Sequence, residues 1–179
     1  MSLEDRCRKI RLLLLDVDGV LTDGRLLYGP EGDWGRTFHV RDGMGLKLAQ
    51  SAGLLTGILS GRRVEATALR AEELGFDEIH QGHPVKLPVL EDILARQELA
   101  LEQVAYMGDD VIDLPLLRRV GLAAAPSDAC PEVAAIAHWH SVRDGGDGCV
   151  RDLIETILRA QGAWQGLIER MGEPAPDAG

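Results

Sequence analysis

Residues 10–19, which read IRLLLLDVDG, decide the fold class of this chain. Four consecutive leucines form an apolar run of strand length that ends at acidic and glycine residues. Such a run is typical of a strand that is buried on both faces, as in a parallel sheet. We therefore predict a central strand over residues 10–17, with Asp16 and Asp18 at its carboxyl end.

The rest of the chain alternates apolar runs with helical patterns. Four further strands are expected, over residues 54–59, 76–80, 104–107 and 121–125. Helices are expected over 42–52, capped by Asp42, and over 64–74, 86–99 and an amphipathic segment around 150–158. This alternation predicts an α/β fold, with a doubly wound, mostly parallel sheet and helices on both faces.

Residues 24–40 interrupt the alternation. Two extended stretches, 25–28 and 34–40, flank the turn-rich segment Gly29-Pro30-Glu31-Gly32-Asp33, which is a hairpin signal. We expect a β-hairpin that projects from the sheet before the next helix. Residues 1–172 are expected to form a single domain, followed by a flexible tail at 173–179.

The composition disfavours several classes of protein. The 179 residues include 29 acidic and 19 basic side chains, and the net charge of -10 argues against binding to nucleic acid or an anionic membrane surface. The apolar run near the N-terminus is too short for a signal segment or a membrane span, so a cytoplasmic protein is expected. Three cysteines, Cys7, Cys130 and Cys149, form no recognisable disulfide framework.

Carboxylates follow two of the predicted strands. Asp16 and Asp18 end the first strand, and Asp109, Asp110 and Asp113 follow the strand at 104–107. A doubly wound sheet can bring these strand ends together, and the repulsion between carboxylates then requires a cation. Oxygen ligands that leave room for water and phosphate suit Mg²⁺. The alternatives are an Asx turn for the first pair and a helix cap for Asp109 or Asp110.

Two further sites carry polar residues near helix starts. Ser60 and Gly61 end the strand at 54–59, where a hydroxyl and free backbone N–H groups can hold phosphate oxygens. Lys86 stands where a helix begins, a position at which a cation is unfavourable unless it serves an anion. A helix-capping serine and a solvated lysine are the ordinary alternatives.

The chain resembles the haloacid dehalogenase superfamily over nearly its whole length. The resemblance rests on four motifs in this order: the strand-end Asp-x-Asp, the strand-end Ser, the lone Lys and Gly-Asp-Asp-x-x-Asp. The resemblance implies that Asp16 is a nucleophile that becomes an aspartyl phosphate. It implies that Asp18 protonates the leaving alcohol and then activates water. Ser60 and Lys86 would stabilise charge on the transferring phosphoryl group.

The same resemblance implies a Mg²⁺ site. Its ligands would be Asp16, the backbone carbonyl of Asp18, and Asp109, while Asp110 and Asp113 would orient them. A chain of this length has no room for the inserted cap domain that usually closes such sites. Something else must therefore shield the chemistry.

Longer matches narrow the resemblance within the superfamily. Residues 16–24, 38–43, 60–62 and 108–115 are similar to the 3-deoxy-D-manno-octulosonate (KDO) 8-phosphate phosphatases, capless enzymes of lipopolysaccharide precursor synthesis. The resemblance implies a sugar-acid phosphate substrate and a homotetramer in which a neighbouring subunit covers the active site. Apolar residues of the expected hairpin that are consistent with such an interface are Leu26, Leu27, Trp34 and Phe38.

The substrate has two candidate forms. Arg62 and Arg41 are candidates to bind the sugar carboxylate, because a guanidinium can do so bidentately; surface salt bridges are the alternative. Asp147, where relatives often have a basic residue, and Val85, before Lys86, depart from the family pattern. A nine-carbon nonulosonate 9-phosphate is therefore an alternative substrate to the eight-carbon one.

Other classes of protein are weaker alternatives. A phosphorylated receiver domain also joins acidic residues, Ser or Thr and Lys on a parallel sheet, but its phosphoacceptor belongs to a middle strand. An inactive scaffold domain would not need to retain all the motifs above. His138 and His140 would point to one face if their segment were a strand, but no matched ligands lie nearby, and we interpret them as structural.

Overall fold

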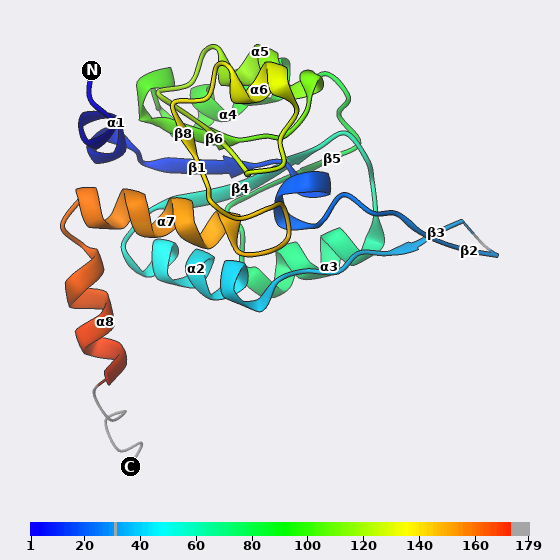
Figure 1. Ribbon diagram of the computed structural model, residues 1–179, viewed down its shortest axis with the longest axis horizontal. Coiled ribbons are helices and arrows are strands. Elements are labelled where there is room, and N and C mark those ends of the chain that lie inside the picture. Colours follow the sequence, from blue (N-terminus) through cyan, green and yellow to red (C-terminus); the bar gives the residue numbers. More distant parts are fainter. Residues whose placement is uncertain (31, 173–179) are drawn as a thin grey trace.

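A central sheet with helices on both faces and one projecting hairpin make up the molecule (Figure 1). The computed structural model describes residues 1–30 and 32–172. The tail expected at 173–179 lies outside the described residues. Among the described residues, no helix has the length and apolar character that a membrane span requires.

The sheet has six strands in the order β5-β4-β1-β6-β7-β8, and every pairing between neighbours is parallel. The strands are β1 (Leu12–Leu15), β4 (Leu55–Ser60), β5 (Glu78–Gln81), β6 (Val104–Met107), β7 (Leu122–Ala125) and β8 (Trp139–His140). The doubly wound parallel α/β fold predicted from the sequence is confirmed. The sequence pattern placed the third of these strands two residues early, and it did not predict β8.

The apolar run that decides the fold lies at the centre of this sheet. Leu12 pairs with Leu55 of β4 on one side and with Val104 of β6 on the other. All four leucines of β1 are fully buried. Because successive side chains of a strand point to opposite faces, Leu13 and Leu15 pack in one core and Leu12 and Leu14 in the other.

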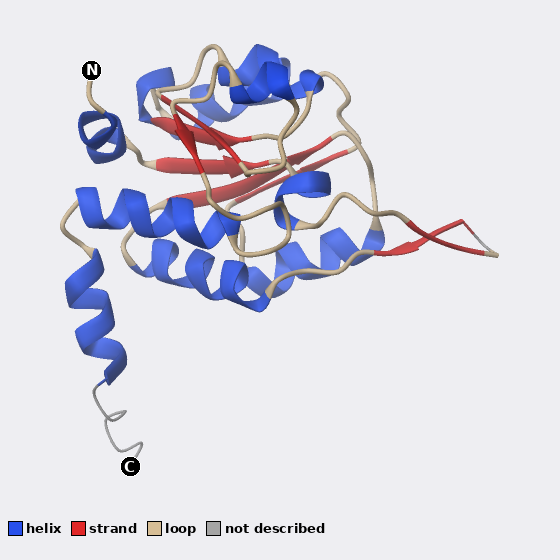
Figure 2. Ribbon diagram, in the orientation of Figure 1, coloured by secondary structure: helices blue, strands red, loops and turns tan. Residues whose placement is uncertain are grey.

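Two layers of helices cover the two faces (Figure 2). One face is covered by α1 (Leu3–Lys9), α2 (Val40–Ser51), α3 (Glu65–Leu74) and α7 (Cys149–Ala160). The last helix, α8 (Trp164–Gly172), packs against α7 and runs away from the sheet (Figure 1). The other face is covered by α4 (Leu87–Gln97), α5 (Leu114–Leu117) and α6 (Pro131–Ala134). The predicted apolar face of the 150–158 segment is buried in α7, as expected for an amphipathic helix.

Short helical turns connect these elements near the sheet edges. They are η1 (Val17–Leu21), η2 (Leu101–Gln103) and η3 (Val111–Asp113). The first is irregular, because Asp18 has an extended backbone and Gly19 has φ +94°. A positive φ of this kind favours glycine, so the turn directly after β1 depends on this residue.

The projecting hairpin comprises β2 (Leu27–Gly29) and β3 (Gly32–Gly35), paired antiparallel. The predicted hairpin is present, but its second arm ends at Gly35, and Val40 already begins α2. Among the described residues, this hairpin is the only regular structure between η1 and α2. Phe38, which the sequence suggested as an exposed hairpin residue, packs partly buried against the main core.

The start of α2 also differs from the prediction. His39 precedes the helix without a capping side-chain bond, and Asp42 lies inside the first turn. Asp42 Oδ1 instead accepts a hydrogen bond from the Arg151 backbone N–H of α7, at 2.8 Å. Asp42 thus caps a helix more than one hundred residues away, a partnership that local sequence patterns do not reveal.

Candidate active site

The carboxyl ends of β1, β4 and β6 meet at one edge of the sheet and form a pocket of about 220 Å³. This is the position at which open parallel sheets bind their ligands. The residues that line it are Asp16, Asp18, Ser60, Gly61, Arg62, Asp109, Asp110 and Ile112. Seven of these eight are residues that the sequence singled out.

Asp16 extends β1 by one residue, because its backbone N–H donates to the Met107 carbonyl at 2.9 Å. Its carboxylate Oδ1 lies 2.8 Å from the ammonium of Lys86. Burial raises the pKa of Asp16 to about 6; the nearby Asp113 adds to this and Lys86 opposes it. The group is therefore a buried carboxyl that a cation must keep ionised.

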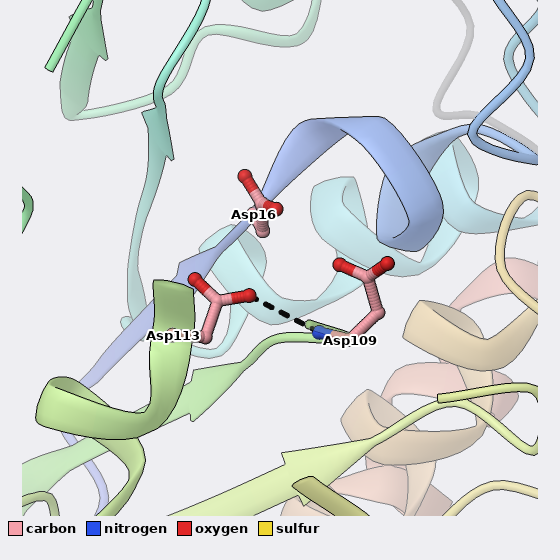
Figure 3. A group of neighbouring side chains, drawn as sticks. All are labelled: Asp16, Asp109 and Asp113. Carbon is pink, nitrogen blue, oxygen red and sulfur yellow. Dashed lines mark hydrogen bonds between the residues drawn. The ribbon is translucent and has the colours of Figure 1, made fainter. Parts of the chain in front are cut away.

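Three carboxylates converge beside this point (Figure 3). Asp16, Asp109 and Asp113 each offer an oxygen, and these oxygens all lie within 4.8 Å of one another. Burial, with the neighbouring carboxylates, raises the pKa of Asp109 to about 8. Asp109 Oδ1 is buried and has no hydrogen-bond partner among the described residues. An unpartnered buried oxygen among crowded carboxylates fits a hard divalent cation such as Mg²⁺.

The turn after β1 brings the backbone close to this cluster. A Cβ built on Gly19 would lie 2.1 Å from Asp109 Oδ2, so a larger residue would collide with the carboxylate. The Thr22 hydroxyl holds the turn: it donates to the Val17 carbonyl at 3.2 Å and accepts from the Gly24 N–H at 3.2 Å. The turn is thereby fixed against the acidic cluster.

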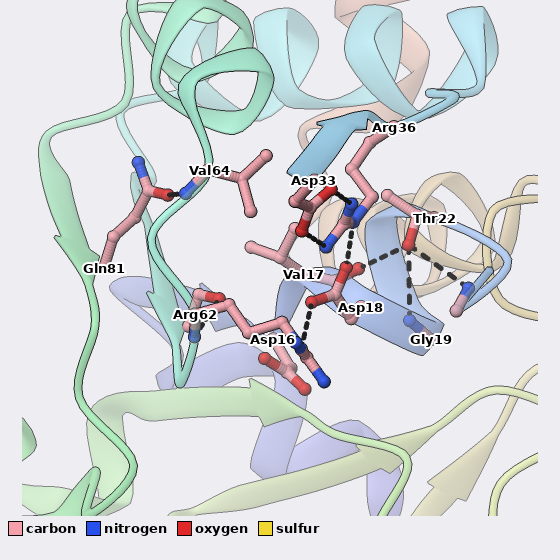
Figure 4. Close-up of polar contacts among 12 residues, drawn as sticks. Asp16, Val17, Asp18, Gly19, Thr22, Asp33, Arg36, Arg62, Val64 and Gln81 are labelled. Carbon is pink, nitrogen blue, oxygen red and sulfur yellow. Dashed lines mark hydrogen bonds and ion pairs between the residues drawn. The ribbon is translucent and has the colours of Figure 1, made fainter. Parts of the chain in front are cut away.

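The Asp18 carboxylate points toward two arginines (Figure 4). Its Oδ1 lies 2.5 Å from Arg36 Nε, and its Oδ2 lies 3.7 Å from Arg62 Nε. Arg62 was a candidate from the sequence, whereas Arg36 was not. Arg36 follows the end of β3, so the hairpin reaches the pocket through this side chain.

Comparisons with known proteins agree with this geometry. Residues 77–151 match the haloacid dehalogenase-like hydrolase family. The chain is 40% identical over 161 residues to the KDO 8-phosphate phosphatase KdsC of Yersinia pestis, covering 90% of this chain and 86% of that protein. The chain belongs to the KdsC family of haloacid dehalogenase-like phosphatases.

Solved structures of the KdsC family have the same fold. A probable YrbI family phosphatase from Pseudomonas syringae pv. phaseolica 1448a superposes with a TM-score of 0.94 and 42% identity, covering 96% of this chain and 98% of that one. The KDO 8-phosphate phosphatase of Moraxella catarrhalis superposes with a TM-score of 0.91 and 33% identity, covering 94% and 97%. That enzyme was crystallised with magnesium, phosphate and KDO.

In this member of the KdsC family, Lys86 sits in a fully enclosed network. Its ammonium lies 2.7 Å from Asp113 Oδ1 as well as close to Asp16, and the Lys86 side chain is excluded from solvent. Burial by itself lowers the pKa of Lys86, but the two carboxylates outweigh it and the net pKa is raised. The alternative of a solvated lysine is therefore wrong.

Tyr106 completes this network and was missed by the sequence analysis. Its hydroxyl donates to Asp113 Oδ1 at 2.5 Å and accepts from Lys86 Nζ at 3.0 Å. The side chain is fully buried on the α4 face of β6, and burial raises its pKa well above the usual value. The sequence signal that could have indicated this role was a tyrosine within an otherwise apolar strand, just before Gly108-Asp109-Asp110.

Ser60, Gly61 and Asp110 occupy the pocket as expected. Ser60 ends β4, and its hydroxyl accepts from the Arg62 backbone N–H at 3.2 Å. The Asp110 side chain accepts from the Val111 N–H at 2.8 Å and so caps a helical turn, which was its alternative role. It also lines the pocket.

Several residues considered from the sequence lie outside the pocket. Arg41 is exposed on the first turn of α2 and is not among the lining residues, so the structure does not bring it to the site of its own chain. Asp147 Oδ1 lies 4.0 Å from His39 Nε2. His138 Nδ1 accepts from the Ala123 N–H, and His140 Nε2 contacts the Ala134 carbonyl. Both histidines have structural partners in the backbone.

Proposed function

We propose that this protein hydrolyses KDO 8-phosphate to KDO and inorganic phosphate with the help of Mg²⁺. Its relatives of the KdsC family, and the KDO-containing structure of the Moraxella catarrhalis enzyme, support the choice of substrate. The observation that carries the reaction class is the convergence of Asp16, Asp109 and Asp113 at the strand edge, with Lys86 bridging two of them.

The proposed reaction has two displacements at phosphorus. An Asp16 oxygen attacks, the bond from phosphorus to the sugar oxygen breaks, and Asp18 gives its proton to the departing alkoxide. Asp18 then takes a proton from water, whose oxygen attacks the aspartyl phosphate and releases the Asp16 carboxylate. Ser60 and the Gly61 backbone offer donors to the phosphoryl oxygens, and Lys86, enclosed beside Asp16, offers positive charge.

The metal ligands in this proposal are Asp16, the backbone carbonyl of Asp18, and Asp109, oriented by Asp110 and Asp113. The bound Mg²⁺ supplies positive charge that lets one anion approach another. Asp109 contributes the buried oxygen for which residues 1–30 and 32–172 supply no hydrogen-bond partner. Asp113 does not need to reach the cation, because it accepts from the Asp109 N–H at 3.1 Å and from Lys86.

Arg62 is the proposed partner of the sugar carboxylate. Its side chain is 53% exposed at the pocket rim and holds Asp18 only at 3.7 Å, so it can turn toward an incoming anion. A planar guanidinium binds a carboxylate bidentately. Arg41, which does not line the pocket, has no part in this assignment.

We further infer a single domain over residues 1–172 that assembles as a homotetramer, with neighbouring subunits over the active sites. The exposed apolar hairpin residues Leu27, Tyr28 and Trp34 support an interface there, since solvent-facing apolar groups of this size favour a partner. The cytoplasmic compartment and the absence of nucleic-acid or membrane partners stay predictions from the sequence.

The test is an assay of phosphate release from octulosonate 8-phosphate and nonulosonate 9-phosphates, with Mg²⁺ and with a chelator. We expect rapid release from the eight-carbon substrate, lost with the chelator and in Asp16→Asn. Asp23→Asn is the matched control, because Asp23 lies in the same segment but pairs only at the surface with Arg25. Preference for a nine-carbon substrate would correct the substrate; a lasting phosphoprotein without turnover would contradict the phosphatase assignment.

A further inference from the structure

The hairpin and the catalytic turn are joined by one buried guanidinium. Arg36 directly follows β3, and its Nε lies 2.5 Å from Asp18 Oδ1 (Figure 4). Its two terminal nitrogens bind both oxygens of Asp33 on the hairpin, at 2.6 and 3.0 Å. Nη1 also donates to the Gly35 carbonyl at 2.9 Å. The hairpin strand and the turn after β1 therefore share this side chain.

The two arginines beside Asp18 differ in how firmly they are held. The Arg36 side chain is 0% exposed, whereas that of Arg62 is 53% exposed. Arg36 contacts Asp18 at 2.5 Å and has three further hydrogen bonds, whereas Arg62 contacts it only at 3.7 Å. Arg36 is thus held tightly beside Asp18, whereas Arg62 contacts it only loosely.

The contact distinguishes the two oxygens of Asp18. A guanidinium donates hydrogen bonds and cannot accept them, so the oxygen it holds, Oδ1, is the one that stays unprotonated. Oδ2 faces Arg62, which lines the pocket. A proton on Asp18 therefore belongs on Oδ2, the oxygen on the side of Arg62.

We propose that Arg36 is a positioning residue for Asp18, which fixes the carboxyl group for proton transfer and makes its geometry depend on the hairpin. The inference rests on the proposed role of Asp18 in the phosphatase reaction. In the first displacement, the Oδ2 proton passes to the alkoxide as the phosphorus–oxygen bond breaks. In the second, Oδ2 takes a proton from the attacking water, and the bond from phosphorus to Asp16 breaks.

The test uses Arg36→Gln with two substrates that differ in their leaving groups. A sugar alkoxide needs a proton to depart, whereas p-nitrophenolate does not. With KDO 8-phosphate we expect kcat to fall by about 10- to 100-fold with KM within about twofold of the parent protein. With p-nitrophenyl phosphate, stopped-flow should show a first turnover close to that of the parent, followed by slow steady turnover, because only hydrolysis of the aspartyl phosphate still needs Asp18.

The controls separate positioning from general damage. Arg25→Gln removes an exposed arginine near the same hairpin and should leave both steps unchanged. Asp33→Asn weakens the hold on Arg36 without removing this arginine. It should therefore lower kcat in the same pattern but by a smaller factor. This second variant still tests the proposal if Arg36→Gln does not fold. Mg²⁺ affinity, measured by calorimetry, should be unchanged in all three variants.

Three results would overturn the proposal. The first two concern KDO 8-phosphate: a kcat that is unchanged in both Arg36→Gln and Asp33→Asn, or a change in KM alone. The third is an equal slowing of the burst and of the steady turnover with p-nitrophenyl phosphate. The last would mean that the whole pocket had shifted. Failure of the parent protein on every sugar-acid phosphate would instead refute the proposed substrate, and the burst experiment with p-nitrophenyl phosphate would still test Arg36.

Discussion

Lys86 Nζ lies 2.7 Å from Asp113 Oδ1, in an ion pair whose two side chains are both excluded from solvent. The same ammonium lies 2.8 Å from Asp16 Oδ1, so one cation serves two carboxylates. Tyr106, on the α4 face of β6, bonds to both Lys86 and Asp113. A buried pair of this kind is costly to break, since the remaining partner keeps its charge without compensation.

Lys86→Met should therefore lower the free energy of unfolding by about 3–5 kcal/mol. Urea denaturation in the presence of a chelator measures this change in the free energy of unfolding. Arg25→Met is the control, because Arg25 is 88% exposed and pairs with Asp23 at 3.7 Å. The control should cost about 0–1 kcal/mol. Equal losses in the two variants would show that the Lys86 network contributes no more than a surface pair.

Gly19 is expected to be essential for metal binding. Gly19→Ala places a methyl group 2.1 Å from the present position of Asp109 Oδ2, and the carboxylate must move. We expect Mg²⁺ affinity to fall by about 10- to 100-fold, as when the support of a metal ligand is lost. Calorimetric titration with Mg²⁺ provides the measurement.

Gly32→Ala is the matched control for this variant. Gly32 also has a positive φ, of +111°, but no atom of the described part of the chain lies within 4 Å of its Cβ position. It therefore shares the backbone strain without the collision. If both variants bound Mg²⁺ equally well, the close approach of Gly19 to Asp109 would have no bearing on the metal.

The acidic cluster makes the stability of the metal-free protein depend on pH. A carboxyl whose pKa is raised on folding stabilises the fold fully below its unfolded pKa of about 4, and this stabilisation is lost as pH rises through the folded value. The folded values are about 6 for Asp16 and about 8 for Asp109. In chelator, the melting temperature should fall from about pH 5 to about pH 8.5.

Mg²⁺ should reverse this fall, because it binds the ionised carboxylates and not the protonated ones. The rise in melting temperature on adding Mg²⁺ is expected to be larger at about pH 8.5 than at about pH 5. Asp109→Asn should flatten the pH dependence in chelator. A Mg²⁺ effect of the same size at both pH values would refute the coupling.

Asp42 is expected to stabilise α7 from a distance. Its Oδ1 accepts from the Arg151 N–H, whereas its buried Oδ2 has no partner within the part of the chain that the structure describes. Burial raises the pKa of Asp42. Asp42→Ala should cost about 1–2 kcal/mol of unfolding free energy, as for loss of a helix cap. Asp42→Asn keeps the acceptor oxygen and should cost less. Urea denaturation of both variants checks this, and a larger loss for Asn would contradict the capping role.

Local patterns were sufficient for the main elements of the fold. Strand β6 lies where the apolar run at 104–107 placed it, and α3 ends at Leu74, directly before Gly75, whose φ of +65° suits glycine. The errors fall where distant contacts override local signals. Asp42 looked like the cap of its own helix, but it caps α7 instead, because the Arg151 N–H lies within hydrogen-bond distance only after folding.

The pocket also combines features that the sequence predicts with contacts that depend on the folded structure. The sequence by itself determined that Asp16, Ser60 and Asp109 meet at one edge, because parallel strands share a direction and their carboxyl ends share a side. Only the tertiary structure decided that Tyr106 closes the lysine network and that Arg36 holds Asp18. The physical reason is that strand and helix periods specify which face a side chain takes, whereas its partner across the fold depends on how separate elements pack.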